Sequence, residues 1–293
     1  FDYNNPNLLA IDNPATSLVV TDLKGYWALN EGDGLVAYDS GSTLEEDVVQ
    51  NGDFSELGSE EVTDGIFSNG LDDWNQNENF TSVNNQLICN TSDAGLLLYQ
   101  NPITPYIDGK AYEYTFDVVS ITTGNVRARL GNTLSDAIST EGTHSVVIIH
   151  SGTTPTYFVN YGSDAVIDNI SVKQVDPNND WTLGGSWSFG DNVAEADGSS
   201  SSLNIISQNL GLIATKNYKF SFQSNRVSGT LFVRDNDDTT IYTLDSGTGT
   251  ETQTFNLTWS GSGGTLKFYA YDYEGSIDNV SVKELTSADM DVT

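Results

Sequence analysis

The sequence has little of what several large protein classes require. Its 293 residues include one cysteine, Cys89, which excludes an internal disulfide framework. It has 11 lysines and arginines against 41 aspartates and glutamates, so its formal charge is −30. Because phosphate binding needs clustered cations and these are scattered singly, nucleic acid is excluded as a main partner. No apolar run approaches the roughly 20 residues of a membrane-spanning helix.

The sequence also lacks helical periodicity. Apolar and polar residues alternate with a period of two, as in residues 112–118 and again in residues 218–222, and this pattern indicates half-buried strands. Gly, Asn, Asp and Ser separate these strands about every 8 to 12 residues, and nothing longer than a turn is predicted as helix. We therefore expect an all-β protein.

An internal repeat spans much of the chain. Asp73-Trp74 recurs as Asp180-Trp181, and the segment at 166–173 recurs at 276–283, which indicates a tandem duplication of one domain. About eight strands in each copy of roughly 110 residues predict two tandem antiparallel β-sandwiches of the jelly-roll type.

A shorter doubling precedes the repeat. Residues 49–55 resemble residues 62–68, 13 positions later. We assign the second of these segments to the first strand of the first sandwich, because Trp74 follows it closely. The predicted organisation is an extended N-terminal arm at 1–47, a linker or added edge strand at 48–61, sandwiches at 62–175 and 176–286, and a C-terminal tail at 287–293.

Five motifs occur in a recognisable order. They are Asn-Gly-Asp-Phe at 51–54, a Gly-x-x-x-Trp ending at Trp74, a Tyr-x-Phe strand, an arginine-bearing strand and Ile-Asp-Asn-Ile-Ser-Val at 167–172. Over about residues 48–285 this order resembles the carbohydrate-binding modules of families four and nine. Residues 25–32 resemble the opening of a laminin-G or concanavalin-like domain, and too few residues follow for more than a remnant.

The resemblance implies a non-catalytic protein that binds a glycan or polysaccharide. Modules of this kind occur in secreted polysaccharide-degrading enzymes and, with the Asn-Gly-Asp-Phe-Ser-Glu-Leu-Gly-Ser sequence of residues 51–59, on bacteriophage virions. The leading expectation from this resemblance is a virion component for glycan attachment, as tail fibre or capsid decoration. We therefore expect an extracellular or virion-surface protein that contacts other surface proteins and could form a homo-oligomer. Two alternatives stay open, namely the binding portion of a secreted glycoside hydrolase and a purely architectural protein without a ligand.

No catalytic constellation stands out. The two histidines, His144 and His150, share one predicted strand without a third ligand or a nucleophile motif. Most carboxylates stand in Gly-, Asn- and Ser-rich loops, where a solvated turn is expected rather than the carboxylate pair of a glycoside hydrolase. These patterns predict a protein without catalytic activity.

Sugar binding needs aromatic faces together with groups that fix the hydroxyls. Alternation along residues 266–273 puts three tyrosines on the wetter face of one strand, and two arginines occupy matching repeat positions, where each could supply a planar hydrogen-bond fork. The ligand-binding candidates are Tyr269, Tyr271, Tyr273, Arg234, Tyr157, Tyr161, Arg129 and Trp187. Alternatively, the tyrosines pack at a domain interface and the arginines pair with local aspartates.

Calcium is the expected cofactor, because carboxylates and loop carbonyls bind it. The resemblance implies one structural ion where the first and last strands of a module meet. Asp168 and Asp278, with Asp53 or Asp64, match that neighbourhood. The alternative is that the Asp-Asn pairs only shape a bulge.

Overall fold

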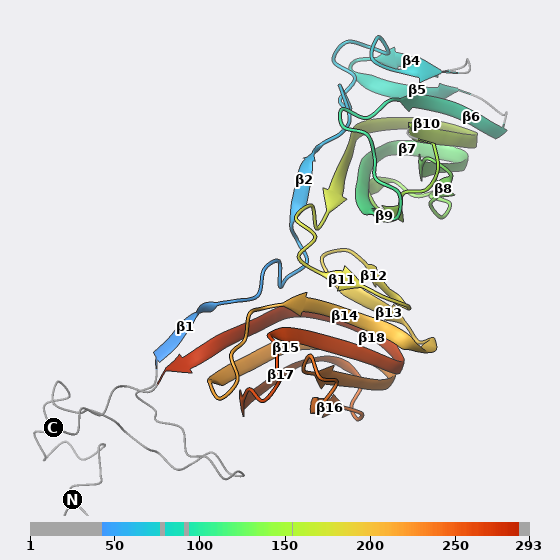
Figure 1. Cartoon of the computed structure of the whole chain (residues 1–293). Helices are drawn as coiled ribbons and strands as arrows, with labels where there is room; N and C mark the ends of the chain where they lie inside the picture. The colour runs from blue at the N-terminus through green and yellow to red at the C-terminus, as the bar shows by residue number, and fades with distance from the viewer. Residues whose placement is uncertain (1–42, 77–79, 91–93, 154, 287–293) are drawn as a thin grey trace, which may run out of the picture.

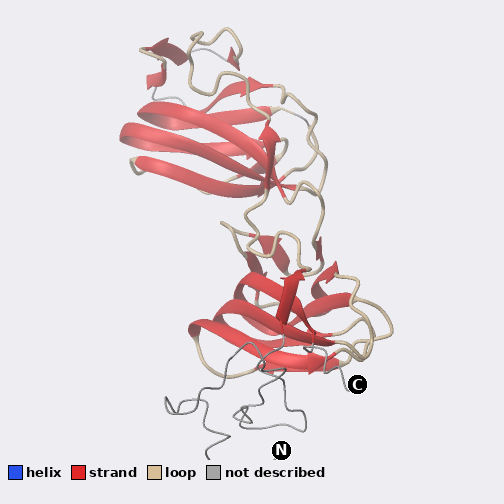
Figure 2. Ribbon diagram, turned by 90° about the vertical axis from the view of Figure 1, so that its left-hand side faces the viewer, coloured by secondary structure: helices blue, strands red, loops and turns tan. Residues whose placement is uncertain are grey.

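The computed structural model describes residues 43–76, 80–90, 94–153 and 155–286, and this part of the chain contains 18 strands and no helix (Figure 2). Accordingly, these residues include no helix that could span a membrane. The predicted all-β fold is confirmed. The predicted arm up to residue 42, the laminin-G-like segment and the C-terminal tail lie outside the described residues.

The strands form two separate antiparallel sheets of nine strands each. The first sheet contains β2 (Leu57–Glu60), β3 (Asn75–Gln76), β4 (Phe80–Val83), β5 (Gln86–Asn90), β6 (Ala94–Gln100), β7 (Ala111–Leu130), β8 (Thr133–Leu134), β9 (Gly142–Ile149) and β10 (Thr156–Val175). The second contains β1 (Thr43–Asp47), β11 (Thr182–Leu183), β12 (Trp187–Phe189), β13 (Ala194–Asp197), β14 (Ser200–Asn209), β15 (Asn217–Arg234), β16 (Thr240–Leu244), β17 (Gly249–Thr258) and β18 (Thr265–Thr286).

Each sheet folds over into a sandwich because its two longest strands run through both layers. In the first, one half of β7 pairs with β9 and the other half with β8, while β10 pairs with β7 along its whole length. In the second sheet, β15 corresponds to β7 and pairs with β17 and β16, while β18 corresponds to β10 and pairs with β15. Two closed apolar cores result. Matching aromatic pairs mark their centres, Phe116 against Phe158 and Phe222 against Phe268, at 5.5 and 5.2 Å between ring centroids.

The second sandwich is built from two separate parts of the chain. Strand β1 pairs with the last residues of β18, with Thr43 opposite Thr286, and Figure 1 shows the two strands side by side. Val49 and Phe54 are buried in the same core as Trp181. We therefore name residues 57–175 sandwich 1, and residues 43–56 with 176–286 sandwich 2.

The chain leaves sandwich 2 and returns to it at neighbouring residues. The amide of Asp176 donates a 3.1 Å hydrogen bond to the carbonyl of Glu56, and Leu57 pairs with Val175 as sandwich 1 begins and ends. Sandwich 1 is thus an insertion in a loop of sandwich 2, with its two ends adjacent, as a tolerated domain insertion requires.

These boundaries differ from the predicted ones, which are a linker or added edge strand at 48–61 and a second sandwich that begins at residue 176. Strand β2 does add a strand to sandwich 1, while residues 48–56 belong to sandwich 2. The prediction uses only one of the two opening turns as the start of a sandwich. In the structure both copies of the short doubling are used, since Phe54 fills the core of sandwich 2 and Phe67 that of sandwich 1.

Candidate functional site

In each sandwich one layer carries arginines on its outward face, which we call the arginine face. In sandwich 1 this layer consists of β3, β6, β8 and the adjoining halves of β7 and β10; in sandwich 2 it consists of β11, β14, β16 and the adjoining halves of β15 and β18. Ala128 and Phe158, like Val233 and Phe268, are buried and paired across neighbouring strands. Because side chains alternate along a strand, the residues between these core positions point outward.

Pairing places the two candidate arginines at the same point of the two faces. Arg129 follows Ala128 and Arg234 follows Val233, and both core residues stand opposite the matching phenylalanines. The match proposed from the repeat therefore agrees with the strand register. What surrounds each arginine differs between the sandwiches.

The arginine face of sandwich 1 is aromatic. Strand pairing aligns a row across it, which reads Asn75, Tyr99, Tyr157, Arg129 and Leu134. The rings of Tyr99 and Tyr157 lie 5.6 Å apart, and the guanidinium carbon of Arg129 lies 4.5 Å from the Tyr157 ring centre.

The second arginine of this face repeats the arrangement one step along the strand. The guanidinium carbon of Arg127 lies 5.3 Å from the ring centre of Tyr161. Between the two pairs, Val159 is only 2% exposed although it points outward. The arginines and tyrosines therefore form a packed layer rather than loose surface side chains.

The arginine face of sandwich 2 is more polar. The corresponding row reads Thr182, Ser207, Lys267, Arg234 and Thr240. Arg234 lies over the ring of Tyr269 at 4.3 Å, and Tyr269 stacks on Phe232 at 6.1 Å. Tyr271 follows on the same strand and is 50% exposed.

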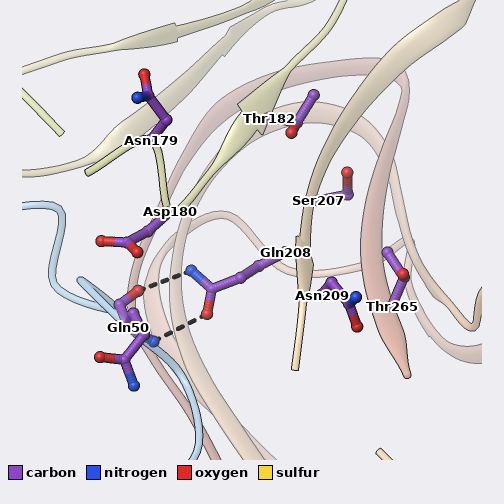
Figure 3. A pocket seen from close by; sticks show the side chains of 8 residues that line it. All are labelled: Gln50, Asn179, Asp180, Thr182, Ser207, Gln208, Asn209 and Thr265. Carbon is purple, nitrogen blue, oxygen red and sulfur yellow. Dashed lines mark hydrogen bonds between the residues drawn. The ribbon is translucent and has the colours of Figure 1, made fainter. Parts of the chain in front are cut away.

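A polar pocket of about 450 Å³ adjoins this row. Its lining residues are Gln50, Asn179, Asp180, Thr182, Ser207, Gln208, Asn209 and Thr265 (Figure 3). The Gln208 amide fixes one wall, since it exchanges two 2.8 Å hydrogen bonds with the backbone of Gln50. Sandwich 1 has the Tyr99 ring at the row position of Ser207, so the smaller side chain leaves room here.

Two of the predicted ligand-binding residues lie in the core instead. Tyr273 is fully buried and donates a 3.0 Å hydrogen bond to the carbonyl of Ser276, while Trp187 is 5% exposed and stacks on it. Burial raises the pKa of Tyr273, against a smaller lowering by Arg226. Neither side chain can contact a sugar, so neither residue belongs to the candidate site.

A bulge explains why alternation misplaced Tyr273. Asp272 adopts a left-handed conformation with φ of 50°, and the register between β15 and β18 shifts at this point. Gly229 accommodates the bulge, because a Cβ there would lie 1.8 Å from the carbonyl oxygen of Asp272. The residue after the bulge turns inward.

The predicted calcium ligands of sandwich 2 are Asp53 and Asp278. Both oxygens of Asp278 accept hydrogen bonds from Asn279, one from its backbone amide at 2.6 Å and one from its side chain at 2.8 Å. Burial raises the pKa of Asp278, and the charge of Asp53 adds to this against the bond from the Asn279 amide. The Asp-Asn turn, which is the alternative to an ion, is therefore formed here.

In sandwich 1 the corresponding carboxylates are engaged locally. Both oxygens of Asp64 accept hydrogen bonds from Ser68 and Asn69 in its own turn. Burial alone would raise the pKa of Asp64, but these bonds outweigh it and lower the pKa. Asp168 accepts hydrogen bonds from the Asn169 amide and the Gln86 side chain. A hydrogen-bonded turn therefore explains these two carboxylates better than a bound ion does.

Three other carboxylates meet where the chain crosses between the sandwiches. Glu56, Asp176 and Asp180 have oxygens within 4.8 Å of one another. Burial, followed by a hydrogen bond with Asp180, raises the pKa of Glu56. The buried carboxylate of Asp176 accepts hydrogen bonds from the amides of Asp180 and Trp181, so it holds the loop that receives the insertion.

Sequence reasoning missed several residues of the arginine faces. They are Tyr99, Arg127, Ser207, Phe232 and Lys267. Tyr99 lies on β6 and Arg127 on β7. They lie close to Tyr157 and Tyr161 because their strands pair. No local sequence pattern predicts which strands pair with each other.

No protein-family model matches the chain, and no curated protein matches it significantly. Among solved structures, a CBM4 domain is 19% identical over 34% of this chain and 76% of its own length, with a TM-score of 0.27. The tandem CBM22 domains from Paenibacillus barcinonensis Xyn10C are 12% identical over 78% of this chain and 97% of theirs, with a TM-score of 0.27. Allantoicase from Saccharomyces cerevisiae is 9% identical over 67% and 79%, with a TM-score of 0.29. These TM-scores are all below 0.5, so none of these likenesses assigns a function to the chain.

Proposed function

We propose that this chain is a non-catalytic glycan-binding protein whose two arginine faces contact the sugar. The observation that carries the proposal is the stacking of arginine on tyrosine on both faces, with a polar pocket beside it in sandwich 2. Tyrosine rings pair with the C–H patches of sugar rings, and guanidinium groups and polar side chains bind hydroxyls. The arginine faces combine both kinds of group.

The carboxylates of the described residues support a non-catalytic role. The three that cluster, Glu56, Asp176 and Asp180, lie where the chain crosses between the sandwiches, with oxygens within 4.8 Å of one another. Asp176 is also occupied by the backbone of its own loop. Hydrolysis of a polysaccharide by this chain alone would contradict the proposal.

The setting that we propose is the surface of a phage virion, as tail fibre or capsid decoration. Its support is the sequence of residues 51–59, which resembles that of virion-surface modules. A secreted polysaccharide-degrading enzyme is the alternative setting. The genes that neighbour the coding sequence would decide between them, since tail and capsid genes or a hydrolase domain would stand beside it.

Structural calcium stays a prediction, and it concerns Asp53 and Asp278 of sandwich 2. A bound ion stabilises a fold by mass action, so chelation should lower the melting temperature of sandwich 2 and D278N should remove that sensitivity. Melting that a chelator leaves unchanged would argue against the ion. It would leave the Asp-Asn turn in place.

Glycan binding is tested with paired tyrosine variants on a broad polysaccharide and glycan array. Y99A with Y157A removes the aromatic row of sandwich 1, and Y269A with Y271A removes that of sandwich 2. Each pair should weaken retention, and all four together should abolish it. I149A is the control, because Ile149 is 49% exposed on the opposite layer of sandwich 1. Wild-type protein that binds no glycan yet assembles on a particle would favour the architectural alternative.

A further inference from the structure

Three of the chain's four arginines lie on the arginine faces, in a protein whose formal charge is −30. Arg127, Arg129 and Arg234 each stack on a tyrosine ring. The ion pairs among the described residues involve His150, Lys216 and Lys267. The three stacked arginines thus have no carboxylate partner there, although the chain has 41 acidic residues.

The hydrogen-bond donors of these arginines are largely unused. Arg129 donates only from Nε, to the carbonyl of Gly131 at 2.7 Å. Arg127 donates from Nε to Asn125 and from Nη1 to the carbonyl of Ser135. Arg234 donates no hydrogen bond within the described chain, and its buried Nε has no partner. Arg129 and Arg234 therefore keep both terminal nitrogens free.

The fourth arginine shows the hydrogen bonds that a purely structural guanidinium makes in the same fold. Arg226 donates from all three nitrogens to the backbone carbonyls of Gly229, Gly247 and Asp245. That side chain closes a loop and has little capacity left. The contrast with Arg129 and Arg234 separates arginines that hold the fold from arginines that present donors outward.

A fixed, planar guanidinium with free terminal nitrogens matches a carboxylate or a sulfate, to which it donates two parallel hydrogen bonds. Stacking on tyrosine holds the fork in place before the ligand arrives, so less side-chain freedom is lost on binding. Stacking also covers one face of each tyrosine ring. The surface therefore offers guanidinium edges beside aromatic rings, more than the open aromatic platform that a neutral sugar chain prefers.

From these observations we propose that the ligand is an anionic polysaccharide, whose uronate carboxylates or sulfate esters are bound by Arg129 and Arg234. This inference rests on the proposed glycan-binding function and narrows it to a substrate class. Lys267, opposite Arg234 on the same face, adds a second cation, but Asp238 partly neutralises it at 2.7 Å. The strong negative charge of the rest of the protein repels polyanions, so binding depends on these local groups.

The test measures binding to matched probes at a fixed ionic strength. Polygalacturonate and its methyl ester share one backbone and differ in carboxylate charge, while a sulfated galactan and its desulfated form isolate the sulfate. Wild-type protein should bind one anionic member at least about tenfold more tightly than its neutral counterpart, since a charged hydrogen bond contributes that much. The pair that shows the preference identifies the carboxylate or the sulfate as the group recognised.

Variants then connect the preference to the forks. R129Q with R234Q should abolish the preference for the anionic probe while binding to the neutral probe persists, and R129K with R234K should restore it in part because the charge remains without the fork. K173Q with K283Q is the charge-matched control, since both lysines lie on the opposite layers. Thermal melting of every variant separates loss of binding from loss of folding.

The possible outcomes distinguish the two proposals. Equal binding to charged and neutral probes, still weakened by the tyrosine variants, would overturn the anionic assignment and leave glycan binding intact. A preference for the anion that falls as much in K173Q with K283Q as in R129Q with R234Q would also overturn it, because the protein would then sense charge in general. Binding to no probe of either pair and to no glycan on the array would remove both proposals.

Discussion

The indole Nε1 of Trp181 donates a 2.9 Å hydrogen bond to the backbone carbonyl of Asn51, 130 positions earlier in the chain. In sandwich 1 the same bond joins Trp74 to Asp64 at 3.3 Å, across 10 positions. One structural link is thus local in one copy and spans the whole of sandwich 1 in the other. The pair shows that the second copy is a complete module that another module interrupts.

The first prediction concerns the limits of sandwich 2. A protein in which Glu56 is joined directly to Asp176 should fold, because these residues already lie next to each other. Residues 176–286 alone should not fold, since they lack β1, Val49 and Phe54. Circular dichroism and thermal melting would show this. A cooperative melt of residues 176–286 alone would contradict the nested arrangement.

The second prediction uses the glycines of the two opening turns. An added Cβ would lie 2.1 Å from the carbonyl oxygen of Val280 at Gly52, and 1.8 Å from that of Ile170 at Gly65. G52A should therefore destabilise sandwich 2, and G65A sandwich 1, by about 1 to 3 kcal/mol. Differential scanning calorimetry should show one transition lowered in each variant. G58A is the matched control, because its nearest neighbour would lie at an ordinary 3.4 Å.

The third prediction concerns the single cysteine. Cys89 is fully buried, and burial, followed by the charge of Asp164, raises the pKa of its thiol to about 12. Because the thiolate is the reactive form, Cys89 should not react with a thiol reagent in the native protein at neutral pH. Its labelling rate should report the opening of sandwich 1. Fast stoichiometric labelling without denaturant would contradict the packing described here.

The fourth prediction concerns acid stability. Hydrogen bonds of 2.6 Å from Thr143 and from Asn169 lower the pKa of Asp117 below its ordinary 3.8. A lowered folded-state pKa means that the stabilisation is complete above the unfolded pKa and is lost as the pH falls through the folded value. The free energy of unfolding of wild-type protein should therefore fall more steeply below about pH 4 than that of D117N. Denaturant titrations at several pH values measure it, and identical slopes would refute the assignment.

The fold class could be predicted because its signal is local. Period-two alternation in residues 112–118 marks a strand whatever that strand pairs with, and a duplicated segment such as 166–173 marks a repeated domain. The nested order could not be predicted in the same way. Pairing of β1 with β18 joins the two ends of the described chain, and no property of either segment specifies so distant a partner.

The candidate site was predicted in part for the same reason. Arg129 and Arg234 were found because the repeat aligns them, and Tyr157 and Tyr269 because alternation shows which way they point. Tyr273 was misplaced because the bulge at Asp272 reverses the alternation. Tyr99 was missed because it belongs to the site only through its direct neighbour Tyr157 on the adjacent strand, and the sequence does not show that pairing.

The insertion also determines how the molecule would respond to mechanical force. Residues 43 and 286 are paired neighbours at one end of sandwich 2, so tension applied between them would peel β1 from β18 one residue pair at a time. Sandwich 1 would carry no tension until that separation had passed Glu56. A protein held at these two points would therefore extend in two steps, and the inner module would be the last to open.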